Sequence, residues 1–170
     1  LVLSGLSKIA ALPQLKLSWI YLNAPSDIRS RIFGALEIVA DTYLSVSTQT
    51  IEITPKVLQD CQPIQKAINE RIKKNYAFMK RAFTEIREVE VCRYCAGWYG
   101  IIKINEFIEE EDFTYKLLSE TGVYVHPGYF YDFQKSNFLV LSLIVEEDIF
   151  QKGTLILASF LSQYNSHNNY

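Results

Sequence analysis

Two lysines near the start of the chain are the residues whose surroundings best suit chemistry. Lys8 follows a short apolar run and the small residues Ser4, Gly5 and Ser7, and Lys16 lies in a second apolar run. A lysine at the end of a buried strand is costly unless its amine is used. Desolvation lowers the pKa of a lysine, which makes its amine a nucleophile near neutral pH. The alternative is a strand-end lysine that extends to solvent.

The first third of the chain should form the strands that position these lysines, followed by helices. Apolar runs indicate strands, and apolar residues recurring every three or four positions indicate helices. A serine before such a helical pattern is a common N-cap. The expected elements are strands at residues 1–3 and 16–22, a helix over 27–44 with Ser26 as its N-cap, and a further helix over 49–60 with Pro55 either inside it or near its first turn.

The rest of the chain begins with a strongly helical pattern over residues 63–87, which spans about 35 Å at 1.5 Å per residue. The acidic cluster at 109–112 suits a helix start, where the helix dipole favours negative charge, so no metal site is needed to explain it. The further expected elements are strands at 89–91 and 98–104, a helix over 107–120 with Gly122 as its C′ residue, a strand at 123–125, an aromatic turn at 126–131, a strand buried on both faces at 137–145, a helix over 146–164 and a frayed tail from 165 to 170.

The segment around Lys8 resembles the lysine signature of the class I/II pyridoxal-phosphate aminotransferases of fold type I. Gly5-Leu6-Ser7-Lys8 fits its pattern, and Ala11, Leu12 and Leu17 fit later positions. The resemblance implies that Lys8 holds the cofactor as a Schiff base, with Gly5 and Ser7 beside it, and that Lys16 contacts its phosphate. The family usually has Arg where Lys16 stands. A lysine offers charge but lacks the planar, bidentate fork of an arginine.

Three later segments resemble the substrate-facing strands and loop of the family's small domain. They are residues 96–99, 122–130 and 138–142. The resemblance places His126 and Tyr129 toward the substrate, although a turn histidine beside a proline is as often structural. The family commonly has an Arg that clamps the substrate carboxylate where this chain has Val140. Either another group does that work or the substrate is unusual.

The expected fold combines α+β and α/β features in three parts. Residues 1–62 are a remnant of the cofactor-binding large domain, and residues 63–87 form a connecting helix. Residues 88–170 form the small C-terminal domain, an α+β layer with a short mixed sheet and packed helices.

The composition and net charge of the chain exclude some classes of binding partner. Hydrophobic residues make up 49% and charged residues 21% of the chain, and the net charge is −2, so neither nucleic acid nor a membrane is expected as partner. Neither a membrane-spanning run nor a signal peptide is recognised, and a cytoplasmic location is expected.

Cys92 and Cys95 have the spacing of a metal or redox pair, but a second pair is missing. We interpret them as thiols along a strand and expect no metal.

The resemblance implies an enzyme that moves an amino group between an amino acid and a 2-oxo acid, working as a homodimer. Leu1 already lies in a predicted strand, and the family's other cofactor contacts precede the lysine. We therefore expect the chain to be the C-terminal part of a longer protein, through truncation, proteolysis or a split gene, and to be inactive alone. The alternative is a non-catalytic, aminotransferase-like domain for ligand sensing or assembly, as in some transcription regulators. Upstream sequence would discriminate the two.

Overall fold

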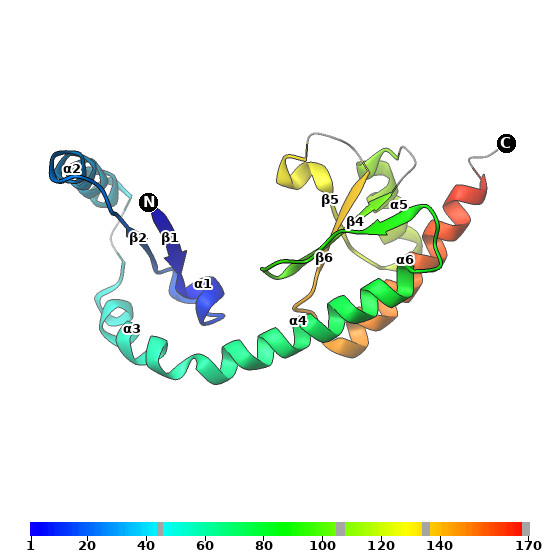
Figure 1. The fold of residues 1–170 in the computed structure, drawn as a ribbon, viewed down its shortest axis with the longest axis horizontal. Coiled ribbons are helices and arrows are strands. Elements are labelled where there is room, and N and C mark those ends of the chain that lie inside the picture. Colours follow the sequence, from blue (N-terminus) through cyan, green and yellow to red (C-terminus); the bar gives the residue numbers. More distant parts are fainter. Residues whose placement is uncertain (44–45, 105–107, 134–136, 168–170) are drawn as a thin grey trace. The chain divides into compact units, whose positions relative to one another are not determined.

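The computed structural model describes residues 1–43, 46–104, 108–133 and 137–167. The chain divides into two compact units, Leu1–Ala67 and Ile68–Tyr170 (Figure 1). The division falls inside helix α4 (Gln62–Phe83), the long helix that the sequence predicts over 63–87. The helix ends four residues earlier than predicted, at a turn that leads into the first strand of the second unit.

Unit 1 is built on a pair of short antiparallel strands. Gly5 pairs with Ser18 and Val2 with Tyr21. The connection between the strands is helical rather than extended, which places both lysines outside the ladder. The elements are β1 (Val2–Gly5), α1 (Leu6–Ile9), the 3-10 helix η1 (Pro13–Leu15), β2 (Ser18–Tyr21), α2 (Ser26–Thr42), α3 (Thr48–Asp60) and the start of α4.

The core of unit 1 is small. Leu6, Ala10, Leu17 and Cys61 are buried, and six half-buried apolar residues pack against them. The helix α2 buries none of its residues. Ile32 and Leu36 are half-buried, and the other large apolar side chains of α2 are exposed, in contrast to the amphipathic packing that such a pattern normally supports.

Unit 2 is an α+β layer around a four-stranded sheet in the order β3-β4-β6-β5. Every pairing in it is antiparallel, so the predicted mixed sheet is wrong, although the α+β class is confirmed. The elements are β3 (Val89–Val91), β4 (Tyr99–Ile104), α5 (Glu110–Thr121), β5 (His126–Pro127), η2 (Gly128–Tyr131), β6 (Phe138–Ser142) and α6 (Glu147–His167).

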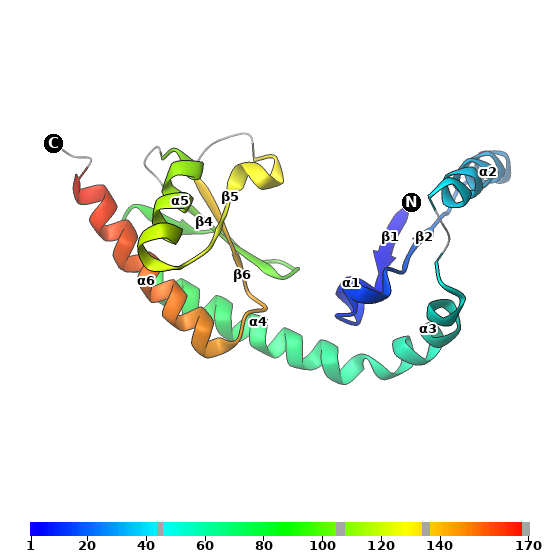
Figure 2. The ribbon, with the colours of Figure 1, turned by 180° about the vertical axis from the view of Figure 1, so that it is seen from behind.

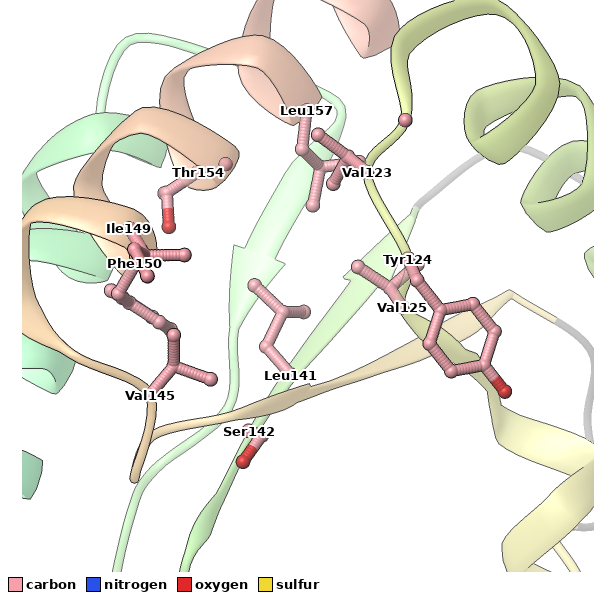
Figure 3. A pocket seen from close by; sticks show the side chains of 12 residues that line it. Val123, Tyr124, Val125, Leu141, Ser142, Val145, Ile149, Phe150, Thr154 and Leu157 are labelled. Carbon is pink, nitrogen blue, oxygen red and sulfur yellow. The ribbon is translucent and has the colours of Figure 1, made fainter.

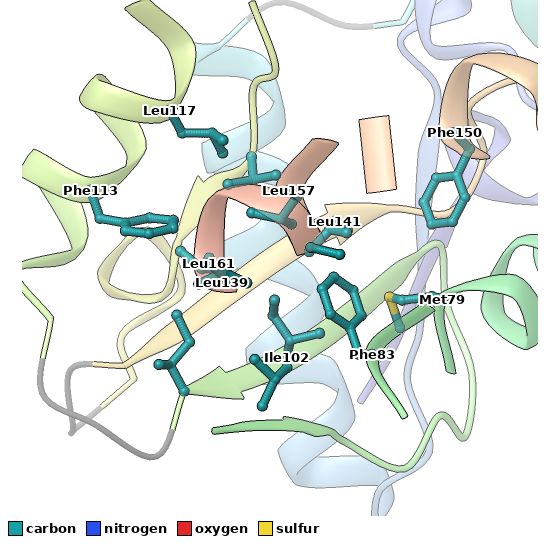
Figure 4. Packing of buried hydrophobic residues seen from close by; sticks show 14 of the residues in the cluster. Met79, Phe83, Ile102, Phe113, Leu117, Leu139, Leu141, Phe150, Leu157 and Leu161 are labelled. Atoms are coloured by element: carbon teal, nitrogen blue, oxygen red, sulfur yellow. The ribbon is translucent and has the colours of Figure 1, made fainter. Parts of the chain in front are cut away.

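The two faces of this sheet differ because side chains alternate along each strand. One face packs on helices α4, α5 and α6, and Figure 4 shows its buried side chains. The helix α6 lies beside α4, where Lys74 Nζ is 3.0 Å from Glu147 Oε1 (Figure 2). The opposite face carries Val140, with Ile101 and His126 as its cross-strand neighbours. The buried set is Ile72, Met79, Phe83, Val89, Ile102, Ile104, Ile108, Phe113, Leu117, Val125, Leu139, Leu141, Leu143, Phe150, Leu157, Ala158 and Leu161.

Several predicted boundaries move, and two of them affect the sites. The predicted strand at 123–125 is wrong: the pairing with β6 begins three residues later than predicted, at His126. Val125 is 5% exposed and belongs to the helix-side core, so the apolar alternation reflects packing and not a ladder. The strand predicted over 16–22 begins only at Ser18, after a turn at Lys16.

The remaining differences are at element ends. Pro25, extended at φ −51° and ψ 151°, occupies the N-cap position predicted for Ser26. The helix predicted over 107–120 begins at Glu110, while residue 107 lies outside the described residues. Gly122 has φ 73° and closes that helix as predicted. The strand predicted over 137–145 ends at Ser142, and α6 runs to His167, so residues 165–167 are helical and not a frayed tail.

Candidate functional site

Lys8 lies in the one-turn helix α1, three residues after β1, and its side chain is exposed. Leu6 and Ala10 are buried at 0% and 1% exposure. Residues four apart share a helix face, and the residue midway between them lies on the opposite side. The burial of Leu6 and Ala10 therefore places the exposed Lys8 side chain on the opposite side of α1. The desolvated strand-end lysine inferred from the sequence is not what this chain forms.

Lys16 lies in a left-handed turn with φ 48°, two residues before β2, and it is also exposed. Its backbone N–H donates to the carbonyl oxygen of Pro13 at 3.2 Å. Ala11, between the lysines, has φ 55°. Positive φ values are uncommon for residues with a Cβ, so two of them in one connection make it a tightly specified backbone.

Gly5 and Ser7 lie on either side of Leu6. A Cβ on Gly5 would lie 2.9 Å from the carbonyl oxygen of Leu17, so the hairpin itself requires glycine at this position. That oxygen also accepts the Leu6 N–H at 3.0 Å. Ser7 is half-buried in α1. Gly5 thus has a structural reason that is independent of any cofactor.

Gln65 is a residue of this site that the sequence reasoning missed. Its Nε2 donates to the carbonyl oxygen of Ile9 at 3.0 Å and to Cys61 Sγ at 3.3 Å. Gln65 therefore ties α4 to the residue after Lys8. A glutamine on a helix carries no sequence signal for such a role, since its partner is 56 positions away.

The second candidate region is the aromatic segment at 126–131 in unit 2. His126 Nδ1 lies 2.7 Å from Tyr131 Oη, with the two rings stacked at 26°. Tyr124 contacts His126 edge-on at 5.1 Å, and Tyr131 contacts Tyr99 of β4 at 5.7 Å. The cluster therefore joins the turn to the sheet face that carries Val140.

Glu110 anchors this segment. It is 5% exposed, and its carboxylate accepts the backbone N–H of Tyr129 at 2.9 Å and of Phe138 at 2.8 Å. Backbone donors to a buried carboxylate compensate its lost hydration. A Cβ on Gly128 would lie 2.7 Å from Phe138 Cβ and 3.1 Å from Glu110 Oε1, which explains the glycine. Sequence reasoning assigned Glu110 only to the helix dipole.

The tyrosines of the segment are donors and not bases. Partial desolvation and the carboxylates of Glu111 and Glu110 raise the pKa of Tyr129. Desolvation and the neighbouring Tyr99 raise the pKa of Tyr131. Because the ordinary tyrosine pKa is about 10, both phenols keep their protons near neutral pH.

Cys92 and Cys95 are free thiols, the first half-buried and the second exposed. Burial and the charge of Glu90 raise the pKa of the Cys92 thiol. No group of three metal-ligating side chains gathers anywhere in the described part of the chain. Nor does any helix among the described residues have the length and apolarity to cross a bilayer.

The predicted site residues fall into two sets. Gly5, Ser7, Lys8 and Lys16 lie together in the β1–β2 connection of unit 1, and His126 and Tyr129 lie together in unit 2.

Solved structures with a similar fold are aminotransferases and a related enzyme. A PLP-dependent aminotransferase from Streptococcus suis superposes with a TM-score of 0.79 at 23% identity, over 95% of this chain and 41% of that one. Alanine aminotransferase from Pyrococcus furiosus superposes with a TM-score of 0.84 at 16% identity, over 95% of this chain and 42% of that one. Cystalysin from Treponema denticola, which contains pyridoxal 5'-phosphate, superposes with a TM-score of 0.80 at 16% identity, over 95% of this chain and 41% of that one.

At these identities the structural likeness shows the fold, and this chain spans about two fifths of the length of the proteins that it matches. No curated protein gave a significant match. The sequence itself matches the profile of the aminotransferase class I and II family over residues 1–146. The chain therefore belongs to the class I and II aminotransferase family.

Proposed function

We propose that this chain supplies the lysine-bearing segment and the small domain of a pyridoxal-phosphate-dependent aminotransferase that transfers an amino group between an amino acid and a 2-oxo acid. The observation that carries the proposal is the exposed Lys8 side chain, placed opposite the buried Leu6 and Ala10 in the connection of the β1–β2 hairpin. The family match over residues 1–146 supports the reaction class. The rest of the cofactor site would come from sequence outside this chain, and the working form would be a cytoplasmic homodimer.

The functional groups of Lys8, Lys16 and Ser7 in unit 1 are chemically suited to holding pyridoxal phosphate. An exposed primary amine at Lys8 can hold an aldehyde covalently, and the exposed ammonium of Lys16, on the same connection, offers charge to a phosphate. Ser7 lies beside Lys8 with a hydroxyl that can donate or accept. When bound, pyridoxal phosphate supplies an aldehyde that bonds amines and a ring that takes up negative charge.

The chain's own residues then have separate tasks. Lys8 holds the cofactor and is the group that carries a proton to and from the substrate carbon. The hairpin and Gln65 keep the backbone around Lys8 fixed, since Gln65 donates to the carbonyl oxygen of Ile9 at 3.0 Å. Such fixed placement is what makes a proton carrier effective.

We propose that His126 takes over part of the substrate contact that an arginine at position 140 would make. Val140 is 3% exposed and carries no charge, and His126 is its cross-strand neighbour on the same face of the sheet. Cross-strand neighbours have Cβ atoms about 5 Å apart, so the imidazole reaches the region beside Val140. Tyr129, as a protonated phenol, offers a further hydrogen-bond donor.

The test uses the protein expressed from the complete reading frame that encodes this chain. Borohydride reduction in the presence of pyridoxal phosphate, followed by peptide mass spectrometry, should label the peptide that contains Lys8. Lys8→Ala should lose both the label and at least about 1,000-fold of transamination, the scale of losing a catalytic acid–base group. The protein should remain folded, because Lys8 is exposed.

The matched control is Lys56→Ala, since Lys56 is an exposed lysine of the same unit that pairs with Asp60 on the surface of α3. It should keep both label and activity. Label on other lysines with an unaffected Lys8→Ala protein would rule out the assigned role. A complete protein with neither label nor activity would favour the ligand-sensing or assembly alternative.

A further inference from the structure

A cavity of about 230 Å³ lies in unit 2 between α6, the end of β6 and the segment 122–125 (Figure 3). Its walls are apolar side chains from all three segments, among them Val123, Leu141, Ile149 and Leu157. None of the twelve lining residues carries a charge.

The cavity exists because the chain leaves the sheet there. Residues 123–125 have the apolar alternation of a strand, yet pairing with β6 begins only at His126. On the opposite wall, α6 has a glycine: a Cβ on Gly153 would meet only Val123 Cγ1, at 4.0 Å. A glycine inside a helix costs about 1 kcal/mol relative to alanine. Because Gly153 has no side chain, the cavity includes space that a larger residue at this position would fill.

Thr154 supplies an unused polar group in this wall. The residue is 2% exposed, and among the described residues its Oγ1 has no hydrogen-bond partner. Figure 3 shows it among the apolar side chains. Elsewhere in this chain threonine hydroxyls donate to the carbonyl oxygen four residues earlier: Thr42, Thr54, Thr84, Thr114 and Thr121 do so.

A buried hydroxyl without a partner is unfavourable and calls for a partner in the cavity. We propose that this cavity binds a neutral, mainly apolar small molecule with one hydroxyl or carbonyl group, which hydrogen-bonds to Thr154 Oγ1. An engineered apolar cavity of about 150 Å³ in another protein holds benzene, so the larger volume here suits a substituted ring or a short branched chain. A carboxylate or ammonium is excluded, because no lining residue would neutralise its charge.

The test titrates the full 170-residue chain with three probes of the same shape: p-cresol, p-xylene and p-toluate. Phenols have a pKa of about 10, so p-cresol is neutral at pH 7. Amide chemical shifts of Gly122 and Gly153, both in the cavity lining, report binding. We expect p-cresol to bind with a dissociation constant below about 5 mM, p-xylene several-fold more weakly, and p-toluate not at all.

Two variants locate the probe. Thr154→Val keeps the side-chain shape and removes the hydroxyl, so it should weaken p-cresol about five- to tenfold and leave p-xylene unchanged, the effect of one neutral hydrogen bond. Gly153→Leu fills the cavity and should abolish binding of both. Circular dichroism checks that each variant is folded. If Gly153→Leu does not fold, the comparison of Thr154→Val with the wild type tests the proposal by itself.

Three outcomes would overturn the proposal. The first is that p-cresol shifts neither glycine amide, so that the cavity holds water only. The second is equal affinity of p-cresol for the wild-type chain and for Thr154→Val. The third is binding of p-toluate as tightly as p-cresol, which would place the probe at another, charged site.

Discussion

The phosphate contact proposed for Lys16 is limited by the geometry of its ammonium group. An ammonium is a point charge, whereas a guanidinium can hold two phosphate oxygens at once. The left-handed turn at Lys16 fixes where the side chain starts, with φ 48°. Lys16 thus combines a fixed backbone with a flexible charge.

In the protein from the complete reading frame, Lys16→Ala should weaken pyridoxal phosphate binding by about 10- to 100-fold, the loss of a charged hydrogen bond of about 1.5–3 kcal/mol. Lys16→Arg should keep or improve the affinity. Fluorescence or absorbance titration of the cofactor measures both. Equal affinity in the wild type and the alanine variant would remove Lys16 from the site.

Glu110 should contribute strongly to stability, because its buried carboxylate accepts the backbone N–H groups of Tyr129 at 2.9 Å and of Phe138 at 2.8 Å. Glu110→Gln removes the charge and turns an NH₂ group toward one of those N–H groups. We expect a loss of about 2–3 kcal/mol in the free energy of unfolding. Chemical denaturation measures it.

The neighbouring Glu111 is exposed and serves as the control. Glu111→Gln should change the free energy of unfolding by less than about 0.5 kcal/mol. Similar losses in the two variants would mean that net acidity at the start of α5, and not the Glu110 hydrogen bonds, supports the turn.

The helix α4 packs within unit 2 through apolar side chains and through several polar contacts, among them the buried amide of Asn75. Asn75 is 1% exposed, and its Nδ2 donates to the carbonyl oxygens of Leu143 at 3.0 Å and Val145 at 2.8 Å. These carbonyls lie in the connection between β6 and α6, after the strand has ended. The amide thus replaces ladder partners that the connection lacks.

Asn75→Ala should therefore lower the free energy of unfolding of unit 2 by about 2–4 kcal/mol, since it leaves two buried carbonyls without donors and a small void. Asn69→Ala, at an exposed position of the same helix, is the matched control and should have little effect. Thermal or denaturant unfolding of the full chain distinguishes them. Equal melting of the two variants would show that the Asn75 hydrogen bonds do not stabilise unit 2.

The 170-residue chain exposes apolar surface on its first strands to an unusual degree. Leu1, Val2 and Leu3 are 70%, 60% and 72% exposed, and Tyr21 of β2 is 63% exposed. Short, apolar strands with open edges pair readily with another chain. By contrast, unit 2 encloses a continuous core of its own.

We therefore expect the 170-residue chain alone to self-associate and to lack both specific cofactor binding and transamination. Sedimentation velocity should show oligomers, and Leu3→Lys should shift them toward monomer by placing a charge on β1. Tyr115→Lys, at an exposed position of α5 in unit 2, is the control and should not. A wild-type monomer that turns over amino acid and 2-oxo acid would contradict the expectation.

Local sequence patterns were enough to predict much of the secondary structure of this protein. The lysine segment, the helices and the central strands of unit 2 are visible in the sequence, because period and capping are local properties: Gly122 ends α5 where a left-handed residue is needed. The family resemblance, carried by Gly5 to Lys8 and by the later aromatic segment, is confirmed by the family match.

Long-range contacts decided the rest. Val123 and Val125 look like a strand, but β6 accepts a partner only from His126 onward, so these valines line a cavity and a core instead. Glu110 looks like any acid at a helix start until Tyr129 and Phe138, 19 and 28 positions away, present their N–H groups to it. Lys8 looks desolvated until the burial of Leu6 and Ala10 turns it outward. Burial and hydrogen-bond partners depend on residues distant in the chain, which periodicity does not encode.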